Sequence, residues 1–109
     1  MALFMVQATY TSEAWTALIA NPQDRRRAIG GLVAKAGGKM IDLYFALGEN
    51  DIVFIFEAPD AVTAASVAVA GYVAGHIKTI KTTQLLTVDE SLELMRRAAA
   101  LGPGPAPAG

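Results

Sequence analysis

The feature that most constrains the fold is a run of five consecutive apolar residues, Ile52 to Phe56. In an extended strand successive side chains point to opposite faces, so this run leaves neither face of the strand polar. A strand of this kind has to be buried on both faces. Burying one large aliphatic or aromatic side chain contributes roughly 1.5–3 kcal/mol. The sequence therefore predicts a strand over residues 51–57 that is covered on both sides.

Composition is a second constraint. The chain has 109 residues, which suffice for one compact domain, and 53% of them are hydrophobic. The mean hydropathy is +0.38. The most apolar stretch, Ala61 to Gly75, is too short and too rich in alanine to cross roughly 30 Å of hydrocarbon, and the N-terminus has no basic region followed by a cleavage site. We therefore expect a soluble, cytoplasmic protein without a membrane partner, whose excess apolar residues form an interface.

Charge and rare residue types exclude several classes of function. A formal net charge of -1 and the absence of a basic run longer than Arg25–Arg27 argue against nucleic acid as a partner. The chain has no cysteine, so disulfides and thiolate metal sites are excluded, and its single histidine, His76, excludes a multi-histidine metal site within one subunit. The acidic residues Asp42, Asp51 and Glu57 have no recognised metal-binding spacing. We expect neither a metal nor a cofactor.

Hydrophobic periodicity and turn residues predict elements in the order β-α-β-β-α-β-α. The expected strands cover residues 3–10, 39–46, 51–57 and 76–87, and the expected helices cover residues 13–20, 23–36, 61–74 and 88–101. Asn21 and Pro22 separate the first two helices, which together act as one crossover. This order is typical of an α+β, ferredoxin-like βαββαβ fold with an antiparallel four-stranded sheet and one added C-terminal helix.

Capping residues mark where the later helices begin. Asp60 is the expected N-cap of the helix that starts at residue 61. Thr87 and Glu90 have the spacing of a capping box, in which each side chain accepts a hydrogen bond from the other residue's backbone N–H. We expect a single domain over residues 1–101 and a flexible tail, rich in proline, glycine and alanine, over residues 102–109.

The predicted fold leaves one face of the sheet without cover. In a ferredoxin-like monomer both crossover helices pack on the same face, so the other face would expose part of the Ile52–Phe56 run to water. A second copy packed face to face across a two-fold axis is the simplest cover. The helix over residues 61–74 also lacks a strongly polar face, although an alanine-rich surface is tolerated on an ordinary helix. We expect a homodimer or a higher oligomer.

A family resemblance lies in the central part of the sequence. The segment from Asp42 to Asp60 resembles the core of the GYD domain family, which is named for its glycine, tyrosine and aspartate signature. Gly48 and Asp51 match the family's glycine and aspartate, whereas Asn50 stands where the family's tyrosine would be.

The resemblance extends in weaker form over about residues 3–92. It implies a dimeric α/β-barrel fold, and it implies no particular chemistry because the family is largely uncharacterised. A more distant similarity is to the ligand-binding domains of the Lrp/AsnC transcription regulators. These domains assemble and bind amino acids or other small effectors between subunits.

His76 is the first candidate for acid/base chemistry, because it is the one side chain with an ordinary pKa near neutrality. The alternative is a structural role at the start of a strand, after Gly75. Arg25–Arg27 is expected to form a solvated helix face, since the apolar residues of that helix point elsewhere.

A ligand site is predicted on the second strand. Asp42 and Tyr44 alternate with Ile41, Leu43 and Phe45, and therefore share the opposite face. If that face meets a partner sheet, the two polar side chains would lie in an enclosed cleft. Its apolar wall is predicted from one face of the first strand, which carries Phe4, Val6, Ala8 and Tyr10.

The hairpin between the second and third strands carries two further candidates, Asn50 and Asp51. Asp51 has two interpretations: it binds a ligand, or it accepts backbone hydrogen bonds within the turn, as aspartate commonly does there.

Three functions agree with these observations. The leading hypothesis is a non-enzymatic, homo-oligomeric module that binds a small molecule between sheets or subunits near Tyr10, Asp42, Tyr44, Asn50, Asp51 and His76. The second is an enzyme resembling cofactor-independent monooxygenases or isomerases of the dimeric α/β-barrel group. In that enzyme His76 would act as the base, and Asn50 or Tyr44 would orient the substrate. The third is a structural unit whose apolar helices bind a larger partner.

Overall fold

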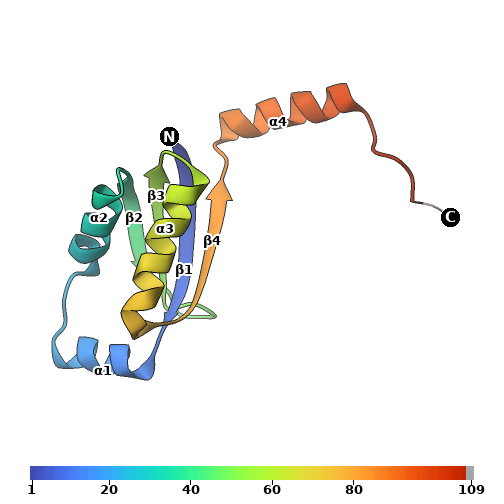
Figure 1. Cartoon of the computed structure of the whole chain (residues 1–109). Coiled ribbons are helices and arrows are strands. Elements are labelled where there is room, and N and C mark those ends of the chain that lie inside the picture. Colours follow the sequence, from blue (N-terminus) through green and yellow to red (C-terminus); the bar gives the residue numbers. More distant parts are fainter. Residues whose placement is uncertain (108–109) are drawn as a thin grey trace.

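The structure is a computed structural model that describes residues 1–107 of the chain. Its sheet has four antiparallel strands in the order β2-β3-β1-β4 (Figure 1). The strands are β1 (Ala2–Tyr10), β2 (Lys39–Phe45), β3 (Ile52–Ala58) and β4 (Ile77–Leu85). The predicted ferredoxin-like α+β fold is thereby confirmed, and its central strands are β1 and β3.

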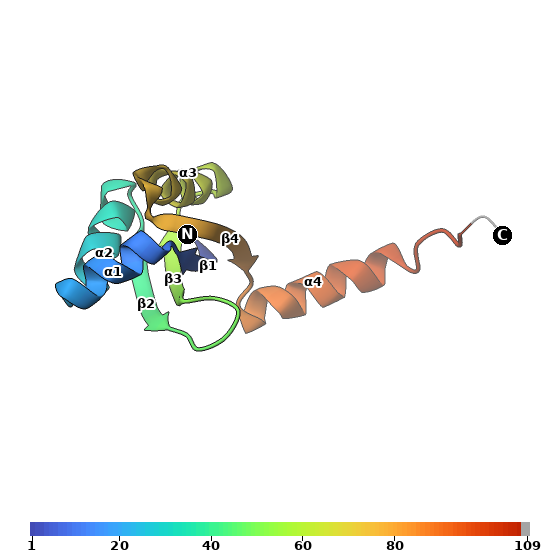
Figure 2. The ribbon, with the colours of Figure 1, turned by 90° about the horizontal axis from the view of Figure 1, so that it is seen from below.

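The helices lie on one side of the sheet, apart from the last one (Figure 2). They are α1 (Ser12–Ala20), α2 (Arg25–Lys35), α3 (Ala61–Gly71) and α4 (Val88–Leu101), and α3 continues into a π-helical turn, η1 (Tyr72–His76). The expected N-cap at Asp60 is present, since its carboxylate accepts a hydrogen bond from the backbone N–H of Thr63 at 2.8 Å. Helices α2 and α3 cover the same face of the sheet, as the element order predicts.

The core lies between this face and the helices. Alternate residues of β1 and β3 are buried there, together with residues of α2 and α3: Phe4, Val6, Ala8, Tyr10, Ile52, Phe54, Phe56, Ala58, Val33, Ala64 and Val67. The ring centroids of Phe4 and Phe56, which pair across the two strands, are 5.8 Å apart. One face of the Ile52–Phe56 run is therefore buried within the chain.

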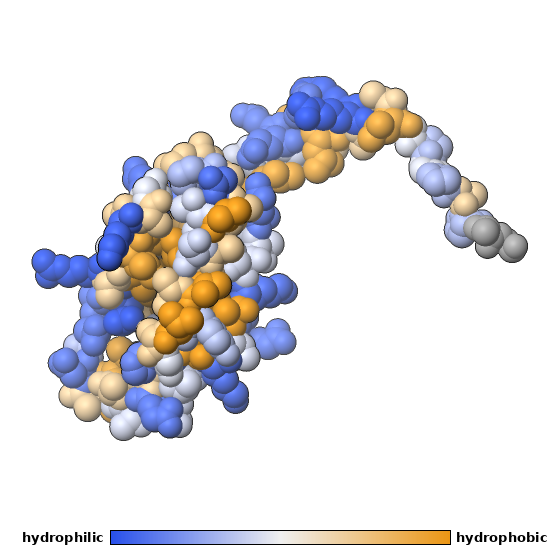
Figure 3. All heavy atoms as spheres, in the orientation of Figure 1, coloured by the Kyte–Doolittle hydropathy of each residue, from blue (hydrophilic) through white to orange (hydrophobic). Residues whose placement is uncertain are grey.

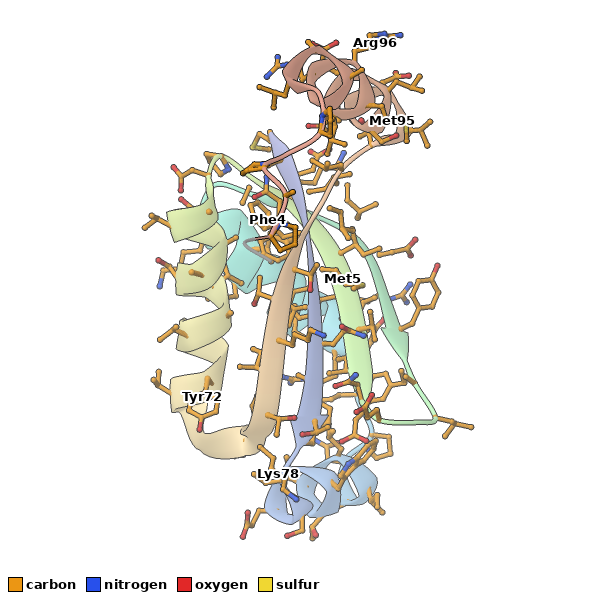
Figure 4. All side chains as sticks on the ribbon, turned by 90° about the vertical axis from the view of Figure 1, so that its right-hand side faces the viewer. Phe4, Met5, Tyr72, Lys78, Met95 and Arg96 are labelled. Atoms are coloured by element: carbon orange, nitrogen blue, oxygen red, sulfur yellow. The ribbon has the colours of Figure 1, made fainter. Side chains whose placement is uncertain are left out.

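The opposite face of the sheet, which we call the open face, has no helix over it (Figure 2). Val53 and Ile55 of β3 and Met5 of β1 lie there and are half-buried. Figure 4 shows the neighbours Phe4 and Met5 on opposite sides of β1. Cover for the open face, which the sequence analysis expects from a second copy, is not provided by any part of residues 1–107.

Strand β2 differs from its predicted pattern because it contains a bulge. Met40 pairs with Phe56, and the next paired residue is Asp42, so Ile41 is the extra residue. Met40 therefore takes the helix-side position that the strict alternation assigned to Ile41, and Ile41 is 48% exposed. After the bulge, Asp42 and Tyr44 lie on one face of the sheet and Leu43 and Phe45 lie on the other. The predicted alternation is therefore correct from Asp42 onward.

Helix α4 projects away from the domain (Figures 1 and 2). Its predicted capping box is present: the Glu90 backbone N–H donates to Thr87 Oγ1 at 3.1 Å, and the Thr87 backbone N–H donates to Glu90 Oε1 at 2.9 Å. Figure 3 shows apolar atoms over α3 and along the lower side of α4, and Val62, Val69, Leu92 and Met95 are among the exposed large apolar residues.

The tail after α4 is exposed over residues 102–107, and the remainder of the predicted tail, residues 108 and 109, lies outside the described residues. Its flexibility stays a prediction. None of the helices found in residues 1–107 is long and apolar enough to span a bilayer.

Gly38 allows the end of α2 to approach β3 closely. A Cβ atom at this position would lie 2.3 Å from the backbone oxygen of Glu57 and 3.1 Å from Cγ1 of Val33. The Gly38 N–H also donates to the carbonyl oxygen of Val33 at 2.9 Å, so the backbone cannot shift without losing this bond. In contrast, nothing lies within 4 Å of a Cβ placed on Gly31, on the exposed side of α2.

We predict opposite effects for alanine at these two glycines. Gly38→Ala should lower the free energy of unfolding by about 1–3 kcal/mol, because the added methyl group overpacks against backbone. Gly31→Ala should raise it by about 0.5–1 kcal/mol, because alanine favours a helix interior. Urea denaturation of both variants and the unchanged chain checks this, and equal effects would contradict the role of the close approach at Gly38.

Candidate functional site

A cavity of about 230 Å³ lies between α2, α3 and the sheet. Its walls are mainly apolar and include Val6, Ala28, Ile29, Leu32, Phe54, Val67, Ala68, Gly71, Ala74 and Ile80. A smaller recess of about 160 Å³, lined also by α1, shares three polar side chains with it: Tyr10, Arg25 and His76. We call the two together the helix-side cavity. Its polar groups come from three different elements.

Tyr10 is the last residue of β1 and is only 7% exposed. Its ring packs against Trp15 of α1, with centroids 5.6 Å apart in an edge-on arrangement, and against Phe45 at 6.2 Å. Burial raises the pKa of the Tyr10 hydroxyl above its usual value, and the adjacent Arg25 guanidinium only partly offsets this effect. The phenol therefore keeps its proton at neutral pH and remains a hydrogen-bond donor.

Arg25 is the first residue of α2 and is half-buried. Its Nη1 donates to Oε1 of Gln23 at 3.1 Å. Its Nε is buried and is the single buried side-chain nitrogen or oxygen without a hydrogen-bond partner among residues 1–107. A buried donor left in this state costs free energy, typically about 1–3 kcal/mol.

Arg25 is the residue that the sequence analysis missed. The solvated face expected for Arg25–Arg27 is correct for Arg26 and Arg27, which are exposed, and wrong for Arg25. The available signal was helical spacing: Arg25 is followed by Ile29 and Leu32 at i+4 and i+7, and therefore shares their inward face.

His76 ends η1 and lies at the mouth of the helix-side cavity, where it is exposed. Its carbonyl oxygen accepts a hydrogen bond from the backbone N–H of Thr11 at 3.0 Å, which connects the start of β4 to the end of β1. The helix-side cavity thus brings together two of the predicted site residues, Tyr10 and His76.

Asp51 holds the hairpin against the end of β1. Its Oδ2 accepts hydrogen bonds from the Tyr10 backbone N–H at 2.8 Å and from Trp15 Nε1 at 3.3 Å. Its own backbone N–H donates to the carbonyl oxygen of Ala8 at 2.9 Å. The carboxylate therefore has a positioning role: it orients the two aromatic residues beside the helix-side cavity.

Asn50 lines a different recess, which is polar and about 590 Å³ in volume. This recess lies beside the open face and brings together three of the predicted site residues, Tyr10, Asn50 and Asp51. It is lined also by Gln7, Thr9, Glu49, Lys78, Thr79, Ile80 and Lys81. Asn50 and His76 do not line a common recess in a single chain.

Asp42 and Tyr44 lie on the open face, opposite Ile55 and Val53 of β3. Tyr44 is 59% exposed, and the neighbouring Asp42 carboxylate raises the pKa of its hydroxyl. The predicted apolar wall for this pair is wrong. Its proposed members, Phe4, Val6, Ala8 and Tyr10, point to the helix side of the sheet because residues of β1 alternate between faces.

Within residues 1–107, no three histidine or acidic residues are grouped closely enough to hold a metal ion.

Comparisons with known proteins address family and fold. A family model described as the GYD domain matches residues 4–95. None of the curated protein sequences compared with the chain matches it significantly.

Among solved structures, MtbAldR is 19% identical with a TM-score of 0.58, over 79% of this chain and 53% of that one. The chain thus spans about half the length of MtbAldR. TTHA0845 from Thermus thermophilus is 16% identical with a TM-score of 0.53, over 81% of this chain and 96% of that one. An uncharacterized NIPSNAP domain protein from Burkholderia xenovorans is 10% identical with a TM-score of 0.51, over 81% and 95% of the two chains. Identities this low show a shared fold alone.

We predict that Asp51→Ala lowers the free energy of unfolding by about 1–3 kcal/mol, because two N–H donors lose their acceptor. The emission of Trp15, the single tryptophan, should change as well. Asp51→Asn keeps an acceptor oxygen and should lose less stability, and Glu49→Ala in the same loop is the control. Urea denaturation followed by fluorescence measures all three, and an Asp51→Ala variant as stable as the control would contradict the positioning role.

Proposed function

The chain belongs to the GYD domain family, and from that premise we propose that it is a homo-oligomeric module that binds a small molecule. The observation that carries the proposal is the helix-side cavity, where Tyr10, Arg25 and His76 converge on apolar walls. A few convergent polar groups in an apolar recess are typical of small-molecule sites. The distant similarity to Lrp/AsnC ligand-binding domains supports the same function.

The location of the ligand differs from the one that the sequence favours. We place it inside one subunit, between the helices and the sheet, because this recess is more enclosed than the recess at Asn50. The residues predicted on the open face, Asp42 and Tyr44, then serve the contact between subunits.

An enzyme that uses His76 as a base with Asn50 or Tyr44 has less support. Asn50 lines the polar recess and Tyr44 lies on the open face, so neither lines the cavity beside which His76 lies. A base acts on a proton within hydrogen-bond reach, and a single chain does not place these three groups around one substrate.

Self-association is proposed through the open face. Met5, Val53 and Ile55 are half-buried there without a covering helix. A two-fold contact would place the same patch of one copy against that of another and remove both patches from water.

We predict that Gly71→Leu prevents ligand binding and leaves the chain folded. Gly71 lines the cavity, and nothing lies within 4 Å of a Cβ placed on it, so a larger side chain enters open space. A thermal-shift screen of amino acids, organic acids, amides and amines should find compounds that raise the Tm of the unchanged chain, since ligands that bind only the folded state stabilise it.

Gly31→Leu, on the exposed side of α2, is the matched control and should respond to those compounds as the unchanged chain does. A screen without any stabilising compound would overturn the binding function. Equal responses of Gly71→Leu and Gly31→Leu would overturn this site.

We predict further that Ile55→Lys gives a monomer in sedimentation experiments at micromolar concentration, because it places a charge at the centre of the proposed contact. Val62→Lys, on the outer surface of α3, should sediment as the unchanged chain does. Circular dichroism confirms that both variants are folded. A monomeric unchanged chain, or dissociation by Val62→Lys alone, would refute association through the open face.

A further inference from the structure

We infer that the helix-side cavity takes a small carboxylic acid anion, with the carboxylate at Arg25 and Tyr10 and a short apolar tail between α2 and α3. This inference rests on the proposed function and adds the chemical class of the ligand. It is carried by charge, by an unpaired buried donor and by the shape of the walls.

The positive charge in the cavity is not balanced by an acidic side chain of the cavity walls. Arg25 is the single side chain among the lining residues that is charged at any ordinary pH, and no aspartate or glutamate lines either part of the cavity. Asp24 is next to Arg25 in sequence, but it pairs with Arg26 at 2.7 Å. The hydrogen bonds from Arg26 lower the pKa of Asp24 to about 2, so that this pair stays charged over the usual pH range.

Asp51, the carboxylate that holds the backbone of Tyr10, is also engaged. Its Oδ2 accepts from the Tyr10 backbone N–H and from the Trp15 indole. An anion that enters the cavity therefore meets a guanidinium without a carboxylate partner. The position of Arg25 adds to this preference, because the first turn of α2 carries a partial positive charge.

Hydrogen bonding points to a carboxylate in particular. The buried Nε of Arg25 has no acceptor, and the Tyr10 hydroxyl is a protonated donor beside the guanidinium. A carboxylate has two acceptor oxygens and matches the planar geometry of a guanidinium, so it can accept from the Arg25 guanidinium with one oxygen and from Tyr10 with the other. His76 stands at the mouth, where its ring can donate to the same group.

The apolar part of the cavity determines which hydrocarbon tail of the ligand fits. The walls beyond the polar groups are apolar, and their small members leave the free space: Ala28, Ala68, Ala70, Gly71 and Ala74. A volume of about 230 Å³ admits a short branched or unbranched chain and excludes a large ring system. These walls offer no partner for a second polar group at the far end of a ligand.

The experiment uses three probes with the same isobutyl tail, isovalerate, isovaleramide and isoamylamine, and inorganic phosphate as an anion that has no tail. Binding to the full chain is measured by isothermal titration and by the fluorescence of Trp15, which packs against Tyr10. We expect isovalerate to bind at least about tenfold more tightly than the amide, because only the anion forms an ion pair with the guanidinium, whereas the amide oxygen is a neutral acceptor. The amine and phosphate should not bind measurably.

The variants Arg25→Gln and Tyr10→Phe test the two donors. Arg25→Gln should weaken isovalerate binding at least about tenfold and affect isovaleramide little. Arg27→Gln, in the same helix and exposed, is the matched control and should bind both probes as the unchanged chain does. Tyr10→Phe should weaken isovalerate binding less than Arg25→Gln, because it removes a neutral donor.

The results separate the inference from the function on which it rests. If the amide or the amine binds more tightly than isovalerate, or if phosphate binds as tightly as isovalerate, the inference of a carboxylate ligand is wrong. The proposed small-molecule binding function is unaffected by that result. Equal loss of isovalerate binding in Arg25→Gln and Arg27→Gln places the anion elsewhere and also overturns the inference. If no probe binds and the wider thermal-shift screen is negative as well, the proposed function fails with it.

Discussion

The rest of the structure depends on the antiparallel pairing of β1 with β3. Phe4 pairs with Phe56 and Val6 pairs with Phe54, and all four side chains are buried beneath the helices. A slip of one residue would turn each of them to the open face, so the apolar core fixes this register. The same alternation places Tyr10 on the helix side, where it lines the helix-side cavity.

Small residues then determine where the core is closed and where it is hollow. Ala64 and Val67 are buried against the sheet in the first part of α3, and the helix packs closely there. Beyond them Ala70, Gly71 and Ala74 leave the space of the cavity. Gly75 has φ +89°, which favours glycine, and it turns the chain so that the next residue, His76, lies at the mouth. The small residues of α3 and of the turn after it thus leave space for the cavity, and alanine also favours the helix itself.

The sequence predicts this fold well because its signals are local. The caps at Asp60 and Thr87 depend on neighbours within a few residues, and both are confirmed. The site was predicted only in part, because it depends on contacts between distant segments. The bulge at Ile41 is set by pairing with β3, and the burial of Arg25 is set by the packing of α2 beside Tyr10. The bulge has no signal within β2 itself, whereas the spacing of Arg25 with Ile29 and Leu32 indicates an inward face but not what Arg25 meets there.

Large apolar residues stay exposed on two adjoining surfaces, the open face and one side of α4, and self-association concerns both. The end of β4 brings Leu85 to the edge of the open face, and the capping box at Thr87 starts α4 two residues later. An isolated helix of this length is marginal in water, so α4 needs a surface that covers Leu92 and Met95. Neither the open face nor the apolar side of α4 is covered within residues 1–107.

A second copy could cover both with one contact, since the two surfaces are joined by a short connection. The same contact would leave the helix-side cavity free for a ligand, because that cavity lies on the opposite side of the sheet.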